Sequence, residues 1–312
     1  MKLRVKSMLA VATVAVLTAV AVPAGASAAL PVHYGSAAFN EAINAELYHP
    51  TTLAGANNGC KPSAAHPYPV VLVHATLTDY GANWLTLSPL LANAGYCVYA
   101  FNYGETQWSY GGRVDGLNYI EKSAEELSTF VNKVLAQTKT SQVDLVGHSQ
   151  GGMMPNYYIK FLGGAPKVHT FVALSPSNHG TTLGGLTELL EKLPWASQLV
   201  QFVEVIGLPA LVEQGVNSPF ITHLFAGGDT VPGPRYVVIE TSHDEVVTPY
   251  TNAFLSGPNV TNILLQNQCP TDKVEHIGMA ADSPAMQNVL NQLSASPNPS
   301  FNATCTNFGI SL

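Results

Sequence analysis

Three residues of this 312-residue chain have the types and the order that nucleophilic catalysis at a carbonyl group requires. Ser149 lies in the segment VDLVGHSQGGMMP, between Gly147 and Gly151 at G-x-S-x-G spacing. A serine hydroxyl is a weak nucleophile by itself, so it needs a histidine base and a carboxylate that orients the base. Asp244 and His276 follow Ser149 in the chain and offer these two groups. We therefore predict a catalytic triad of Ser149, Asp244 and His276.

The setting of Ser149 is more informative than the pattern alone, which a chain of this length contains by chance roughly once in seven cases. The apolar run QVDLVGH predicts a buried strand before the serine, and GGMMPNYYIKFLGG predicts a helix after it. A sharp strand-to-helix turn exposes a nucleophile beside amides of the helix N-terminus. The amide of Gln150 is then one oxyanion donor, and the second belongs to the loop ATLTDYGANW. A helix N-cap is the alternative role for this serine.

The acid and the base follow from chain order, which in this type of fold runs from the serine to the acid and then to the histidine. His276 is the only histidine after Asp244. Glu240 still belongs to the predicted strand RYVVIET, and Glu245 begins the next element. Asp229 precedes that strand and is the weaker candidate. Asp244 lies in the turn after the strand, where the alternative role of an aspartate is to cap the turn.

The elements that must position these residues alternate between strands and helices. Apolar, β-branched runs at 68–74, 96–101, 142–148, 169–175, 235–241 and 261–266 predict buried strands, and helical patterns separate several of them. This order predicts an α/β fold with a mostly parallel, doubly wound sheet. Residues 184–233 form a long apolar insertion without a strand. It is either a helical cap or lid over the site or a set of helices that completes the core.

The N-terminus and the charge balance place limits on location and partners. Residues 1–28 combine a basic start, an apolar stretch and a small-residue cleavage site, which predicts a secretory signal peptide. We expect residues 29–312 to form one domain that is secreted to the extracellular space. The net charge of −7 becomes still more negative without the basic leader, and no basic tract remains that would suit nucleic acid.

Four cysteines in an exported chain suggest two disulfides, for which three connectivities are possible. We favour Cys60–Cys97 and Cys269–Cys305, because neighbours in sequence usually become neighbours in space. No spacing of cysteine and histidine residues suits zinc, and we predict no metal site.

The ordered segments VHATLTDYGANW, GHSQGG, SPSNHGTTLGG, SHDEVVTP and EHIGM resemble the secreted actinobacterial lipases of class 2, which have the α/β-hydrolase fold. The resemblance covers about residues 67–279. It implies the same Ser149, Asp244 and His276, and it assigns the second oxyanion amide to Thr76. Ala75 departs from the glycine usual in these relatives, so a positive φ at this position would strain the backbone.

We therefore expect an ester hydrolase that acts on acylglycerols, without a cofactor and with transient contact to a lipid–water interface. A polyester depolymerase, a short-chain esterase and an acyltransferase can use the same triad, and a binding module that has lost catalysis is a further alternative. The sequence does not indicate the oligomeric state.

Overall fold

The computed structural model describes residues 28–48, 53–182 and 208–311. Within these residues the centre is a sheet in which all neighbouring strands run parallel, in the order β2-β1-β3-β4-β5-β6. The doubly wound parallel sheet predicted from the sequence is thus confirmed. The strands are β1 (Val70–Val73), β2 (Val98–Phe101), β3 (Val143–His148), β4 (Val168–Leu174), β5 (Arg235–Glu240) and β6 (Val260–Leu264).

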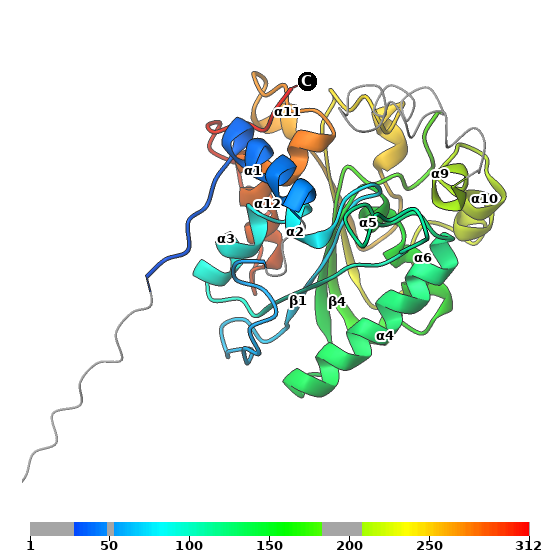
Figure 1. Ribbon diagram of the computed structural model, residues 1–312, viewed down its shortest axis with the longest axis horizontal. Helices are drawn as coiled ribbons and strands as arrows, with labels where there is room; N and C mark the ends of the chain where they lie inside the picture. Colours follow the sequence, from blue (N-terminus) through cyan, green and yellow to red (C-terminus); the bar gives the residue numbers. More distant parts are fainter. Residues whose placement is uncertain (1–27, 49–52, 183–207, 312) are drawn as a thin grey trace, which may run out of the picture.

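Helices cover both faces of the sheet, as Figure 1 shows. Successive side chains of a strand point to opposite faces. Val71 and Val73 therefore join the cluster under α4 (Ile120–Thr138), α6 (Pro155–Phe161) and α10 (Pro219–Phe225), whereas Val70 and Leu72 join the cluster under α3 (Leu87–Asn93) and α12 (Ser283–Leu293). Shorter elements are α2 (Tyr80–Asn83), α5 (Gln150–Met153), α9 (Pro209–Glu213), α11 (Leu265–Gln268), η1 (Ala165–Lys167), η2 (Tyr250–Ala253) and η3 (Ile277–Ala281).

The carboxyl ends of the parallel strands lie at one edge of the sheet, where the predicted functional residues meet. β1 leads into the loop of Thr76, β3 ends directly before Ser149, and β5 ends four residues before Asp244. Because these strands are neighbours or near neighbours in the sheet, residues far apart in the chain lie close together.

The insertion predicted at residues 184–233 is described from residue 208 onward, and the part at 184–207 lies outside the described residues. Its described part contains α9 and α10, and Ala210, Phe220, Ile221 and Leu224 belong to the buried cluster on the α4 side of the sheet. These four side chains therefore pack in the core of the domain, and the role of residues 184–233 as a cap stays a prediction.

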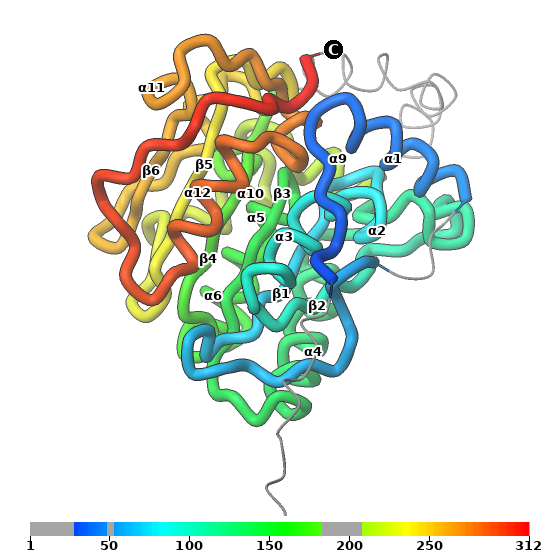
Figure 2. Tube along the Cα trace, turned by 90° about the vertical axis from the view of Figure 1, so that its left-hand side faces the viewer, coloured from blue at the N-terminus to red at the C-terminus, as the bar shows by residue number. Residues whose placement is uncertain are grey.

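Helix α1, close to the N-terminus, and the C-terminal segment pack near the edge that carries the site. The N-terminal helix α1 (Gly35–Tyr48) was not anticipated from the sequence. Figure 2 shows the C-terminal segment passing beside α1, and a side chain at Gly35 would lie 2.6 Å from the carbonyl oxygen of Phe308. The two disulfides are Cys60–Cys97 and Cys269–Cys305, as favoured from chain order, and the second holds this C-terminal segment against α11.

The predicted signal peptide lies almost entirely outside the described residues, which begin at residue 28. Among the helices that the structure describes, none has the length and apolar character needed to cross a membrane.

We predict that Phe220→Ala destabilises the protein by about 3–5 kcal/mol, because it removes a buried aromatic ring from a packed core. Phe220 is 5% exposed, whereas Val212, on α9 of the same insertion, is 56% exposed. Val212→Ala is the matched control and should change stability by less than about 0.5 kcal/mol. Urea unfolding measures both changes. If both substitutions changed the free energy of unfolding by the same small amount, the described part of the insertion would be loosely packed, as expected for a detachable cap.

Candidate active site

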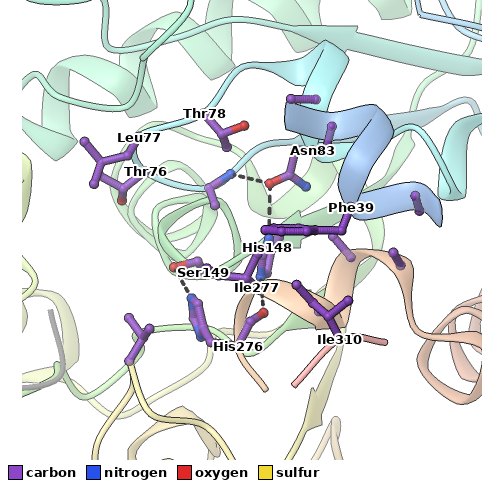
Figure 3. A pocket seen from close by; sticks show the side chains of 18 of the residues that line it. Phe39, Thr76, Leu77, Thr78, Asn83, His148, Ser149, His276, Ile277 and Ile310 are labelled. Carbon is purple, nitrogen blue, oxygen red and sulfur yellow. Dashed lines mark hydrogen bonds between the residues drawn. The ribbon is translucent and has the colours of Figure 1, made fainter. Parts of the chain in front are cut away.

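The side chain of His276 lies within hydrogen-bond distance of both other residues predicted as a triad, Ser149 and Asp244, and Figure 3 shows its contact with Ser149. Nε2 of His276 lies 2.9 Å from Oγ of Ser149, and Nδ1 of His276 lies 2.7 Å from Oδ2 of Asp244. All three residues are at most 7% exposed. A histidine so placed can take the serine proton on one ring nitrogen while the carboxylate holds the other.

The turn at Ser149 is possible only because small residues surround it. Ser149 has φ of 56° and ψ of −122°, a strained conformation for a residue with a side chain. A Cβ atom at Gly147 would lie 1.8 Å from the carbonyl oxygen of Gly151. One at Gly151 would lie 2.2 Å from the carbonyl oxygen of Val73. The two glycines thus let the start of α5 approach β3 and β1.

Electrostatics distinguish Asp244 from its neighbour Glu240. Burial acts to raise the pKa of Asp244, but the charge of His276 and hydrogen bonds from His276, Val247 and Val246 outweigh it and lower the pKa. Burial and the charge of Asp244 raise the pKa of Glu240 well above its usual value. Asp244 is therefore the ionised carboxylate beside the histidine.

The weaker candidate Asp229 lies elsewhere. Its Oδ2 accepts a hydrogen bond from the Ser256 amide at 2.6 Å and lies 3.5 Å from Nε2 of His179. The printed partners of this carboxylate are therefore Ser256 and His179, whereas His276 has Asp244 as its partner.

The predicted oxyanion residues face each other across the site. Oγ1 of Thr76 donates to Oε1 of Gln150 at 2.7 Å. Within residues 28–48, 53–182 and 208–311, neither backbone amide of this pair has a hydrogen-bond acceptor. Ala75 has no positive φ, so the expected strain does not arise. The positive φ of this loop falls instead on Leu77, at 67°.

Gln214, at the end of α9, braces this pair and was not found from the sequence. Its Nε2 atom donates to Oγ1 of Thr76 at 3.0 Å and to Oε1 of Gln150 at 3.1 Å. Its Oε1 atom accepts from Oγ of Ser177 at 2.8 Å. Gln214 follows no recognisable motif, so only the folded chain reveals the contact.

A pocket of about 130 Å³ opens beside Ser149. One wall consists of a face of α1, with small and large apolar side chains at helical spacing. The facing wall comes from η3 and the C-terminal segment. Figure 3 shows Phe39, His148, Ile277 and Ile310 among the side chains that line this pocket. The apolar side chains of the two walls include Ala38, Phe39, Ala42, Ile43, Ile277, Ala280, Ala281 and Ile310.

Glu46 belongs to the same face of α1 and also lines the pocket. Burial, partly offset by a hydrogen bond with Thr78, raises the pKa of Glu46 to about 8, and the charges of Asp79 and Asp115 act in the same direction as burial. Glu46 is therefore mostly protonated at neutral pH, and this wall of the pocket is uncharged.

Solved structures place the fold among the α/β-hydrolases. The crystal structure of Aspergillus fumigatus lipase B matches with a TM-score of 0.59 and 25% identity, over 80% of this chain and 57% of that one. Bacillus licheniformis lipase BlEst2 in its mature form matches with a TM-score of 0.55 and 14% identity, over 75% of this chain and 94% of that one. The second likeness concerns the fold alone.

The family model "Lipase (class 2)" matches residues 67–288, so the chain belongs to the class 2 lipase family. Triacylglycerol lipases from Pseudarthrobacter phenanthrenivorans and Burkholderia plantarii are each 37% identical to it over 99 residues, which is 30% of this chain. These stretches cover 28% and 25% of the two relatives, so the chain matches only about a quarter of their length.

We predict that Glu46→Gln removes part of the loss of stability at alkaline pH. The pKa of Glu46 is about 8 in the folded state against an ordinary 4.5, so folding favours the protonated acid. The stability that this proton provides is complete below about pH 4.5 and is lost as the pH rises through 8, by a total on the order of 3 kcal/mol.

Thermal unfolding between pH 5 and pH 9 measures this effect. The wild type should lose stability toward pH 9 more steeply than the variant. Glu105→Gln, at an exposed position away from the pocket, is the control and should keep the wild-type slope. Parallel curves for all three proteins would contradict a protonated Glu46.

Proposed function

We propose that this chain is a serine hydrolase of carboxylic esters, and that it acts on acylglycerols as a lipase. The observation that carries the proposal is the hydrogen-bonded series from Asp244 through His276 to Ser149, at 2.7 and 2.9 Å, beside an apolar pocket. Membership of the class 2 lipase family supports it, as do the lipases among the relatives.

The geometry fits acyl transfer in two steps. Oγ of Ser149 attacks the ester carbonyl while Nε2 of His276 takes the hydroxyl proton. The amides of Thr76 and Gln150 donate hydrogen bonds to the oxyanion. These hydrogen bonds stabilise the negative charge that develops on this oxygen in the transition state more than they stabilise the uncharged carbonyl of the substrate. His276 then protonates the leaving alcohol, and water releases the acyl group by the same steps in reverse. Asp244 remains ionised throughout and holds the imidazole.

The pocket supports an apolar acyl group as the part of the substrate next to Ser149. Its α1 wall presents Phe39 and Ile43, and the protonated Glu46 adds no charge at neutral pH. We propose that α1 contacts the acyl chain. The sequence had suggested this role for the insertion at 184–233. For residues 184–207, the role of a lid that opens at a lipid–water interface stays a prediction.

We also propose that the protein is exported and that the leader ends near Ala28. The support is the basic and apolar pattern of residues 1–28, together with two disulfides, which persist in oxidising compartments.

We predict that Ser149→Ala lowers ester hydrolysis by about 10⁴-fold or more, because the nucleophile is lost while the fold remains. Initial rates would be measured on a dissolved short-chain ester and on an emulsified long-chain triglyceride. A fluorophosphonate probe should label the wild type and the control Ser141→Ala, but not Ser149→Ala. Activity that survives in Ser149→Ala would refute the mechanism. Cleavage of the short ester alone by the wild type would favour a short-chain esterase.

We predict that Phe39→Ala weakens the preference for longer acyl chains, because it removes apolar surface from the pocket wall. The ratio of kcat/KM for p-nitrophenyl octanoate to that for the acetate should fall about 5- to 10-fold, which corresponds to about 1 kcal/mol of lost burial. Phe161→Ala, on the outer side of α6, is the control. An unchanged ratio in Phe39→Ala would place the acyl chain elsewhere.

A further inference from the structure

His148 is the last residue of β3 and the direct neighbour of the nucleophile. It is 4% exposed, and both ring nitrogens have contacts. Nε2 lies 3.0 Å from the backbone carbonyl oxygen of His276, and Nδ1 lies 3.1 Å from Oδ1 of Asn83. Figure 3 shows the ring between the segments that carry these two residues. Neither contact is within the triad itself, and the steps of acyl transfer do not use His148.

The two contacts reach two different parts of the site. The carbonyl of His276 belongs to the residue whose ring is the proposed base. Oδ1 of Asn83 also accepts the amide of Ala75 at 3.1 Å, and Ala75 precedes the oxyanion residue Thr76. A single side chain therefore lies between the backbone of the base and the support of the oxyanion loop.

The number of protons on the ring decides which contact is a hydrogen bond. Both ring nitrogens face oxygen atoms, but a neutral imidazole has only one N–H. Burial lowers the pKa of His148 to about 3, and the charge of His276 adds to this effect, so the ring is neutral at the pH of catalysis. One of the two contacts must therefore lack a proton from His148.

The proton belongs on Nε2, because the backbone carbonyl oxygen of His276 can only accept a hydrogen bond. An unprotonated Nε2 would place its lone pair against that oxygen at 3.0 Å. Oδ1 of Asn83, which faces Nδ1, already accepts a hydrogen bond from the Ala75 amide at 3.1 Å, so this oxygen has a donor even without a proton from His148.

On the basis of the proposed function, we propose that His148 is a positioning residue that fixes the base by donating from Nε2 to the His276 carbonyl. The only other backbone donor to this oxygen in the described chain is the Met279 amide, at a longer 3.3 Å. Without His148 the backbone of His276 can shift, and its ring can lose its alignment with Ser149. A misplacement on the order of 1 Å can cost about 100-fold in rate.

Two variants test the proposal, because both replace the imidazole with a carboxamide and differ only in the length of the side chain. The amide of His148→Gln reaches the position of Nε2, whereas that of His148→Asn reaches only the position of Nδ1. We expect kcat within about threefold of wild type for His148→Gln and a fall of about 10- to 100-fold for His148→Asn. KM should change less than about threefold in both, since the apolar walls of the pocket, formed by α1, η3 and the C-terminal segment, are unchanged. His169→Gln, which replaces a histidine at the start of β4, is the control.

A second readout does not depend on turnover. Proton NMR reports the downfield Nδ1–H of His276 in its hydrogen bond to Asp244, identified by its absence in His276→Gln. The resonance should persist in His148→Gln and shift or broaden in His148→Asn. Equal kcat and equal spectra in the two variants would overturn the proposal, and so would an effect confined to KM. An inactive wild type with the expected spectra would instead refute the proposed function and leave the positioning role supported.

Discussion

The close approach of three backbone segments around Ser149 is the constraint on which the rest of the site depends. The carbonyl oxygens of Gly151 and Val73 occupy the space that Cβ atoms at Gly147 and Gly151 would need. The serine can then take a positive φ, and its hydroxyl lies at the sheet edge rather than in the core. Gln150 begins α5 directly after Ser149, so one steric arrangement positions both the hydroxyl and the amide that we propose as an oxyanion donor.

Burial then determines which groups carry charge. Glu240 and His148 are buried beside the triad, and burial keeps both of them neutral. Asp244 remains ionised because His276 and two backbone amides stabilise its charge against the same burial. Because Glu240 and His148 are neutral, the negative charge beside the imidazole of His276 is that of Asp244. In a medium of low dielectric constant, that interaction is stronger than it would be in water.

The substrate side of the site is assembled from parts of the chain that are remote in sequence. α1 supplies one wall, and η3 with the C-terminal segment supplies the other. The insertion contributes Gln214, which braces Thr76 against Gln150. The Cys269–Cys305 disulfide keeps the C-terminal segment in place, and packing of Gly35 against Phe308 joins it to α1. The pocket thus depends on tertiary contacts at both ends of the chain.

The sequence by itself determined the strands, their parallel arrangement and the order of Ser149, Asp244 and His276, because apolar periodicity and turn chemistry act over a few residues. It did not reveal α1, whose apolar face is half exposed and mixed with polar residues. Nor did it reveal the contacts of Gln214 and His148, since a hydrogen bond between distant residues leaves no local pattern. Only the tertiary structure brought these groups together, because the parallel sheet places the ends of separate strands at one edge.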